Sequence, residues 1–150
     1  MFIDYLDSVV GKIKISADEN YLNEIQFVDS QNSKINCNKI TDEAKRQLTA
    51  YFQRKIIEFN LPLKLIGTEF QKKTWKEIAR IPFGKVRTYG QIAISLGNKY
   101  YSRAVGNAAG KNKFPIIIPC HRVVANSHIG GFSSGVDKKI ILLKFEKYIK

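Results

Sequence analysis

Apolar and polar residues alternate along the first 30 residues in the manner of short, half-buried strands. The alternation is clearest over residues 12–15, where lysine and isoleucine take turns. The pattern predicts three antiparallel strands, over residues 2–6, 12–16 and 21–28. Gly11 and the polar run at residues 18–20 supply the turns between them.

A polar loop over residues 29–39 separates these strands from a helical pattern. Apolar side chains recur there on one side of a helix, at Ala44, Leu48, Tyr51 and Phe52. The pattern predicts a helix from Thr41 to about Arg54. Residues 56–65 are a candidate further strand, which Pro62 would confine to a sheet edge or a boundary because proline has no amide hydrogen to donate.

The second half of the chain is mainly helical. Two capping boxes, Thr68 with Gln71 and Thr88 with Gln91, predict helices over residues 69–80 and 89–96. A Gly97-Asn98 turn follows, and Ser102 is placed to cap a further helix over residues 103–110. Two short helices joined by a glycine-containing turn are typical of a helix-turn-helix.

Two more elements are expected towards the C-terminus. The apolar run over residues 114–119 resembles a buried strand, and a last helix is predicted from a cap at Asp137 to Tyr148. Together the elements predict an α/β N-terminal domain over residues 1–65, with a three-stranded antiparallel sheet and a helix. A mainly helical C-terminal domain over residues 66–150 follows it.

The charge of the chain is concentrated in its second half. The net charge is +12, but residues 63–150 hold 17 basic and 4 acidic side chains, whereas residues 1–62 hold 8 basic and 9 acidic ones. A solvated basic surface is the ordinary interpretation of such a chain. Concentration of the whole excess in one half favours a binding surface for a phosphate backbone.

Cysteine usage and hydropathy exclude several classes of protein. Cys37 and Cys120 are the two cysteines and lie far apart, without the spacing of a zinc site or a disulfide framework. No secretory signal peptide and no apolar run of about 20 residues is visible. We therefore expect a reduced, cytoplasmic protein, without a metal or a cofactor and without a membrane segment.

Cys120 and His121 are adjacent and follow the apolar run 114–119. The thiolate is the nucleophilic form of cysteine, and a neighbouring base or cation lowers the thiol pKa from about 8.5. A lone cysteine is more often a small buried hydrophobic residue. Cys37 keeps that interpretation, whereas Cys120 is a candidate nucleophile.

The predicted second helix of the helix-turn-helix, residues 103–110, consists almost entirely of small residues. Proteins that read the major groove usually present long polar side chains to the base edges. A smooth helix with Arg103 as its one long cation fits the minor groove instead. A tightly packed core helix remains an equal alternative from composition alone.

The segments Pro-Cys-His-Arg-Val at 119–123, Arg-Ala-Val-Gly at 103–106 and Phe-Gly-Lys-Val-Arg-Thr-Tyr-Gly-Gln at 83–91 resemble the O6-alkylguanine-DNA alkyltransferase family. The resemblance is strong over residues 66–150 and coarse before them. It implies a ribonuclease H-like N-terminal domain and a winged helix-turn-helix. It also implies direct, irreversible and stoichiometric transfer of the alkyl group from O6-alkylguanine in double-stranded DNA to a cysteine, after the base is flipped through the minor groove.

The resemblance assigns roles to individual residues. Cys120 would accept the alkyl group, His121 would be the base acting through a bound water, and Glu146 would orient His121. Asn112 would brace the active-site turn, and Tyr89 would assist base flipping and hydrogen-bond the base. Arg103 would fill the gap in the duplex, and further DNA- or substrate-binding residues would be Ser102, Ala104, Gly106, Arg122, Val123, Phe132 and Ser133.

Four positions depart from the family pattern as we expect it: Lys113, Phe132, Ser134 and Ile141. Phe132 lacks a hydroxyl that is frequent beside the pocket, and Ser134 stands where glycine is common. The size range of the alkyl group and activity on O4-alkylthymine are therefore left open. The partner is expected to be damaged DNA, bound largely without sequence preference by a monomer.

Three alternatives remain at this point. A cysteine hydrolase would need an oxyanion hole and would leave the basic half unused. A helix-turn-helix regulator would need longer side chains on residues 103–110. An alkyltransferase-like damage sensor would have replaced Cys120.

Overall fold

The structure, a computed structural model, describes residues 1–149, which fall into two compact units. The first unit is Met1–Leu65 and the second begins at Ile66. Each has its own core of buried apolar side chains, and each is described separately below.

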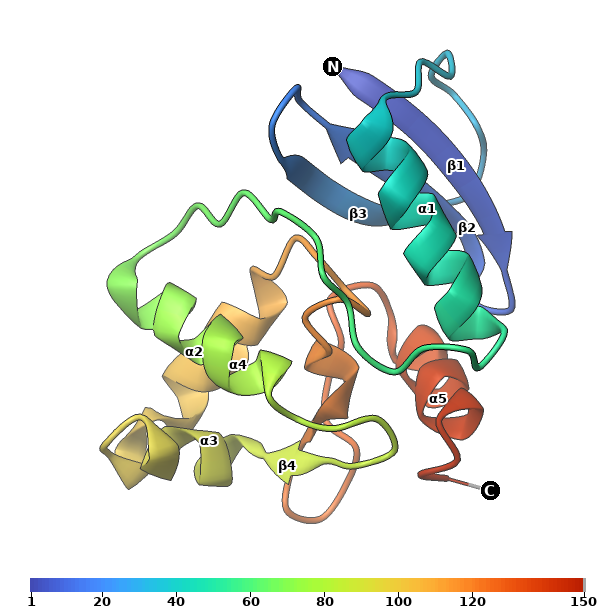
Figure 1. Cartoon of the computed structure of the whole chain (residues 1–150). Helices are drawn as coiled ribbons and strands as arrows, with labels where there is room; N and C mark the ends of the chain where they lie inside the picture. The colour runs from blue at the N-terminus through green and yellow to red at the C-terminus, as the bar shows by residue number, and fades with distance from the viewer. Residues whose placement is uncertain (150) are drawn as a thin grey trace. The chain divides into compact units, whose positions relative to one another are not determined.

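The first unit is a three-stranded antiparallel sheet with a helix on one face (Figure 1). The strands β1 (Phe2–Ser8), β2 (Gly11–Ala17) and β3 (Leu22–Val28) pair in sequence order, and α1 (Lys39–Phe52) packs against them. The core is formed by fully or almost fully buried side chains of both layers: Ile13, Ile15, Leu22, Ile25, Ala44, Leu48 and Tyr51. The predicted strands and their antiparallel order are confirmed. The prediction succeeded because the alternation of apolar and polar residues shows directly which face of a strand is buried.

Two details of the first unit differ from prediction. Helix α1 begins at Lys39 and not at Thr41, because Asn38 is the N-cap and its side chain accepts hydrogen bonds from the Ile40 and Thr41 amides. The predicted strand over 56–65 is wrong. Over residues 56–65 only Leu63 forms a β-bridge, with Leu22 of β3. Pro62, next to it, has no amide hydrogen and so cannot donate the hydrogen bond that a longer strand would need.

The second unit contains the predicted short helices. Helices α2 (Glu69–Ala79) and α3 (Tyr89–Ser95) each begin with the expected capping box, in which the threonine hydroxyl and the glutamine side chain exchange hydrogen bonds with the backbone. Helix α4 (Ser102–Gly110) follows α3 and packs on α2, where the Trp75 indole donates to the Ala108 carbonyl at 2.8 Å. Small residues on α4 allow this close packing.

The start of α4 was predicted incorrectly. A 3-10 turn, η1 (Lys99–Tyr101), precedes the helix and is capped by the Asn98 side chain. Ser102 is therefore the first residue inside α4, and its hydroxyl makes only a long contact of 3.5 Å to the Lys99 carbonyl. Ser102 does not cap the helix.

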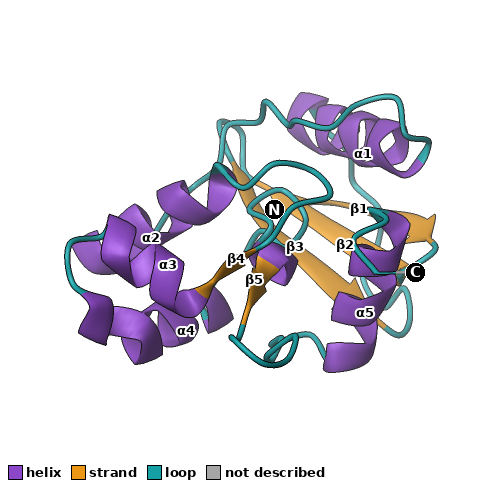
Figure 2. Ribbon diagram, turned by 90° about the horizontal axis from the view of Figure 1, so that it is seen from below, coloured by secondary structure: helices purple, strands orange, loops and turns teal. Residues whose placement is uncertain are grey.

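The apolar run over 114–119 is a turn and not a strand. The Ile118 amide donates to the Phe114 carbonyl, and Ile116 has a φ of 75°, which no extended strand contains. The run leads into a 3-10 turn, η2 (Cys120–Arg122), and only then into the two-residue strand β5 (Val123–Val124). Figure 2 shows β5 beside β4 (Arg87–Thr88), with which it pairs in parallel. A wing on the helix-turn-helix stays a prediction.

The last helix, α5, is shorter than expected and spans Val136–Phe145. Its N-cap is Gly135, with a φ of 109°, so Asp137 lies within the first turn and is not the cap. Its C-cap is Glu146, which the sequence pattern had placed inside the helix. None of the helices over residues 1–149 combines the length and the apolar character that a membrane span requires.

Candidate active site

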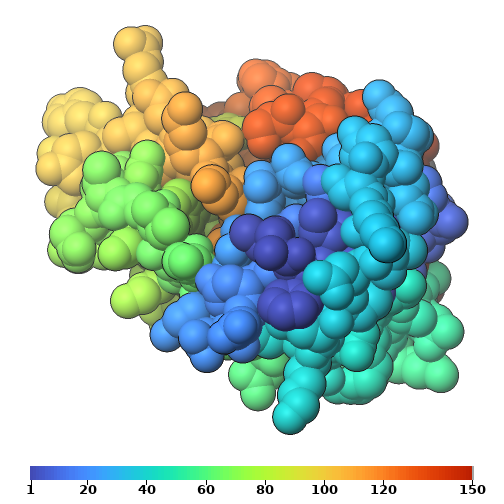
Figure 3. Space-filling view, turned by 90° about the horizontal axis from the view of Figure 1, so that it is seen from above, coloured from blue at the N-terminus to red at the C-terminus, as the bar shows by residue number. Residues whose placement is uncertain are grey.

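Cys120 lies at a cavity of about 210 Å³ in the second unit. The walls are built from α3, α4 and the loop before α5, and include Tyr89, Gly106, Gly110, Gly131, Phe132 and Ser133. Glycines line much of the cavity, so a flat ligand can approach the backbone closely. In the space-filling view of Figure 3 the segment around η1 and the start of α4, yellow to light orange, lies on the surface, and a narrow column of its light-orange atoms projects outward.

The turn that carries the thiol is fixed by Asn112. Its Nδ2 donates to the Ile118 carbonyl at 2.8 Å and to the Cys120 Sγ at 3.2 Å, and its Oδ1 accepts from the Phe114 amide. The side chain thus replaces the ladder hydrogen bonds that the predicted strand would have formed. The Asn112 amide also supplies a polar contact to the buried sulfur.

Burial raises the pKa of the Cys120 thiol to about 11, although the Asn112 hydrogen bond and the charge of Lys139 oppose this. The sequence had suggested a thiol pKa lowered towards neutrality by the neighbouring imidazole. In the structure the low-polarity surroundings dominate, so Cys120 rests as a neutral thiol at physiological pH. Its proton must leave when the sulfur reacts.

The next residue, His121, is buried and held by Glu146. Its Nε2 lies 2.9 Å from Glu146 Oε2, and a carboxylate at this distance fixes the imidazole proton on Nε2. Nδ1 is then an acceptor, and it is buried with no hydrogen-bond partner within the described part of the chain. Burial lowers the pKa of His121 in spite of the attraction of Glu146, so the imidazole is neutral and able to accept.

Glu146 is a buried carboxylate held by several donors. Arg122 binds it through two nitrogens, Nε to Oε1 and Nη2 to Oε2, each at 2.8 Å. The Gly84 amide adds a longer contact of 3.3 Å to Oε1. Burial alone would favour the protonated form, but the hydrogen bonds from His121 and Arg122 outweigh it and hold the pKa of Glu146 well below its usual range.

Arg122 does not have the position that its predicted DNA-binding role requires. Its side chain is only 5% exposed, and its third nitrogen, Nη1, donates to the Ile81 carbonyl at 2.6 Å. A guanidinium with all of these partners is not available to a phosphate or a base. The prediction is wrong because the sequence alone could not tell a buried arginine from an exposed one.

Lys139 is a buried cation that sequence reasoning missed. Its ammonium donates to the Val123 carbonyl at 2.6 Å and to the Gly131 carbonyl at 2.9 Å, and lies 6.0 Å from the centre of the Tyr89 ring. Burial lowers its pKa to about 8. A signal was present in the sequence, since Lys139 stands three and four residues before Leu142 and Leu143 and so shares their buried face.

The structure brings the remaining predicted residues to two places. Tyr89, Gly106, Phe132 and Ser133 line the cavity with Cys120. Val123 is fully buried beside it, with its carbonyl on Lys139. Ser102, Arg103 and Ala104 instead lie in the first turn of α4, where Arg103 is exposed.

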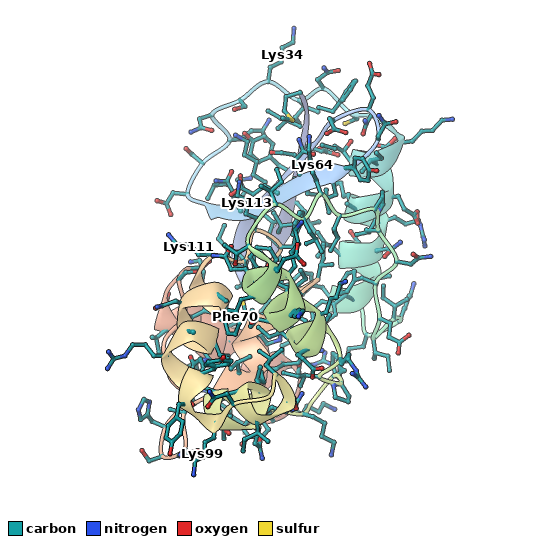
Figure 4. The ribbon with its side chains drawn as sticks, turned by 90° about the vertical axis from the view of Figure 1, so that its left-hand side faces the viewer. Lys34, Lys64, Phe70, Lys99, Lys111 and Lys113 are labelled. Carbon is teal, nitrogen blue, oxygen red and sulfur yellow. The ribbon has the colours of Figure 1, made fainter. Side chains whose placement is uncertain are left out.

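Figure 4 shows lysines at both ends of α4, with Lys99 before the helix and Lys111 and Lys113 after it. All three are exposed, as is Arg103 on the helix itself. A cationic surface therefore follows α4 in the same unit as the cavity. The fold and the site together define a mainly helical unit with a buried free cysteine at a cavity, next to a histidine that is paired with a buried glutamate.

Comparison with known families identifies the class more closely. Residues 1–65 match the ribonuclease-like domain of 6-O-methylguanine DNA methyltransferase, and residues 69–148 match the DNA-binding domain of the same proteins. The chain belongs to the 6-O-methylguanine DNA methyltransferase family.

Individual relatives agree over nearly the whole chain. The methylated-DNA–protein-cysteine methyltransferase of Methanosarcina acetivorans is 40% identical, over 97% of this chain and 98% of its own. A probable enzyme of the same name from Acanthamoeba polyphaga mimivirus is 42% identical, over 98% and 97%. The crystal structure of the Mycobacterium tuberculosis O6-methylguanine methyltransferase has a TM-score of 0.87 at 34% identity, over 97% of this chain and 92% of its own. The structure of OGT from the same organism in complex with DNA has a TM-score of 0.88 at 35% identity, over 98% and 93%.

Proposed function

We propose that this protein repairs DNA by moving the alkyl group of O6-alkylguanine onto the sulfur of Cys120, once per protein molecule. The observation that carries the proposal is a buried thiol at a glycine-lined cavity, next to an imidazole whose Nδ1 is a buried acceptor. Family membership supplies the reaction class, methylated-DNA–protein-cysteine methyltransferase. The residue roles below are our assignment.

The transfer exchanges one bond for another. The Sγ–carbon bond forms while the carbon–O6 bond breaks, and the electron pair of the broken bond stays on O6. The thiol proton passes to His121 Nδ1 through a bound water, and Glu146 stabilises the imidazolium that results. Burial keeps the Tyr89 phenol protonated by raising its pKa, so Tyr89 can donate to the departing guanine.

The product explains single use. A thioether has no good leaving group, so the alkyl group stays on the sulfur of Cys120. The proposed protein is therefore consumed in the reaction. No cofactor is needed to balance the step, since the thiol supplies the nucleophile and the proton.

DNA binding is assigned to the second unit. Residues 66–150 hold 16 basic and 4 acidic side chains, a net charge of +12, and α4 presents a smooth surface with Arg103 at its start. We propose that phosphate contacts bind the duplex, that α4 enters the minor groove, and that Arg103 fills the gap left by the flipped nucleotide. The boundary at 65/66 would separate this alkyl-acceptor domain from an N-terminal domain whose role we leave open.

We also propose that the protein acts as a monomer in the cytoplasm. The residues of the cavity and of the Cys120–His121–Glu146 chain all belong to the second unit, so the proposed site needs no residue of a second copy. A thiol nucleophile stays reduced in the cytoplasm, where glutathione and thioredoxin maintain it.

A titration tests the proposal. A fixed amount of protein is mixed with increasing amounts of duplex DNA that carries labelled O6-methylguanine. Transfer is expected to stop at one methyl group per protein molecule, whatever the excess of DNA. Unmethylated duplex is the control, and continued turnover or release of free methanol would show a hydrolase instead.

A further inference from the structure

We propose that Arg122 is a positioning residue for alkyl transfer, which holds the Glu146 carboxylate towards His121 and keeps the imidazole neutral. The proposal rests on the function assigned to Cys120 above. It concerns a residue that touches neither the sulfur nor the cavity. Arg122 would act through Glu146.

The geometry of the carboxylate is set by the guanidinium. Arg122 donates to both oxygens of Glu146, in the paired arrangement that is the strongest and most directional of arginine–carboxylate contacts. Its Nη1 is in turn fixed on the Ile81 carbonyl just beyond α2. The carboxylate is thus clamped with Oε2 facing His121 Nε2 at 2.9 Å.

The three side chains form one buried unit. His121, Arg122 and Glu146 are 0%, 4% and 3% exposed. His121 and Arg122 are consecutive residues of the η2 turn, yet both reach the same carboxylate at the end of α5. A lysine could not replace Arg122 fully, because an ammonium is a point charge and cannot supply the parallel pair of donors.

The charge of Arg122 also bears on His121. The ionisable groups around the imidazole are Glu146, Arg122, Lys139 and Cys120. Glu146 favours the imidazolium, while the positive charges of Arg122 and Lys139 disfavour it and help burial to lower the pKa of His121. Without Arg122, the attraction of Glu146 for the imidazolium would no longer be opposed by the nearest positive charge. The pKa of His121 would then rise, so that the imidazole would stay protonated up to a higher pH.

That shift would impair the reaction. A protonated imidazole cannot accept the proton of the Cys120 thiol. Loss of Arg122 is therefore expected to slow methyl transfer near neutral pH, and a higher pH is expected to restore part of the rate. A purely structural loss would lower the rate equally at all pH values.

The test compares Arg122→Met and Arg122→Lys with Arg46→Met, which removes an arginine from an exposed pair with Glu43 in the other unit. The chain has only two histidines, so NMR titration of the ring signals can follow His121 directly, with His128→Gln to assign the resonances. Methyl transfer is measured across the same pH range. The titration needs no DNA, so it judges this inference even if no variant accepts a methyl group.

We expect the His121 midpoint to move up in Arg122→Met, with methyl transfer roughly 10- to 100-fold slower at neutral pH and partly recovered at higher pH, within what a general base contributes. Arg122→Lys should fall between it and the wild type, and Arg46→Met should match the wild type. An unchanged or lower midpoint in Arg122→Met, or a pH-independent loss of rate, would overturn the proposal. If Arg122→Met does not fold, Arg122→Lys tests the proposal by itself. A lysine variant with the same transfer rate and the same His121 midpoint as the wild type would show that the paired donors of Arg122 are not needed, and would overturn the proposal.

Discussion

Cys120→Ala is expected to abolish methyl transfer from O6-methylguanine DNA and to leave DNA binding intact. In the proposed reaction the sulfur forms the new bond, and Cys120 is the only cysteine among the residues that line the cavity. The exposed cations around α4, Lys99, Arg103, Lys111 and Lys113, are unaffected by the change. A methyl-transfer assay and a DNA-binding titration on the same preparation measure the two effects.

The affinity of Cys120→Ala for DNA should fall steeply as salt rises, because phosphate contacts release counterions. Cys37→Ala is the matched control, since Cys37 is exposed and lies in the other unit. It should transfer and bind like the wild type. Residual transfer in Cys120→Ala, or binding that does not depend on salt, would contradict the assignment.

Glu146→Gln is expected to reduce both stability and reactivity. The variant leaves the Arg122 guanidinium buried without its counter-charge, which typically costs about 3–5 kcal/mol. It also removes the group that stabilises the His121 imidazolium, so transfer should slow. Chemical denaturation and the methyl-transfer assay report the two losses separately, and Glu69→Gln on the exposed first turn of α2 is the control.

The pH dependence of stability gives this prediction a second readout. Because the folded-state pKa of Glu146 lies below its unfolded value of about 4.3, the carboxylate contributes stability that is present above that pH and is lost as the pH falls. The wild type should therefore lose stability below about pH 4.5 more steeply than Glu146→Gln. Equal acid sensitivity of the two proteins would show that Glu146 is not held ionised by the fold.

Local patterns predicted the parts of the fold that local interactions determine. Alternation gave the three strands, because each buried isoleucine of β2 reports the covered face of the sheet. The capping boxes at Thr68 and Thr88 gave the starts of α2 and α3, because both partners lie within one helical turn. The motif around Cys120 gave the family.

Predictions failed where side-chain hydrogen bonds, which hydrophobic patterns do not report, determine the structure. The run 114–119 is apolar enough for a strand, but Asn112 supplies side-chain hydrogen bonds that close it into a turn. The sequence suggests that Arg122 binds DNA, but in the structure its side chain binds Glu146, which lies 24 residues further along the chain. Lys139 was overlooked for the same reason, since its two carbonyl acceptors lie 8 and 16 residues away.

The cavity also changes the interpretation of the thiol. The adjacent imidazole does not make Cys120 a resting thiolate, because burial raises the thiol pKa to about 11. The site therefore holds a neutral thiol and a neutral imidazole until a substrate arrives. Such a thiol should react slowly with general oxidants, because the thiolate is the reactive form. It can still react with an aligned alkyl group when its proton is removed in the same step.

The central claim is that Cys120 receives the alkyl group, and peptide mapping by mass spectrometry tests it most directly. The protein is incubated with duplex DNA containing O6-methylguanine, digested, and both cysteine peptides are weighed. We predict that the Cys120 peptide alone gains one methyl group in place of a hydrogen atom, while the Cys37 peptide is unchanged. An unmodified Cys120 peptide after the DNA has lost its methyl groups would contradict the account.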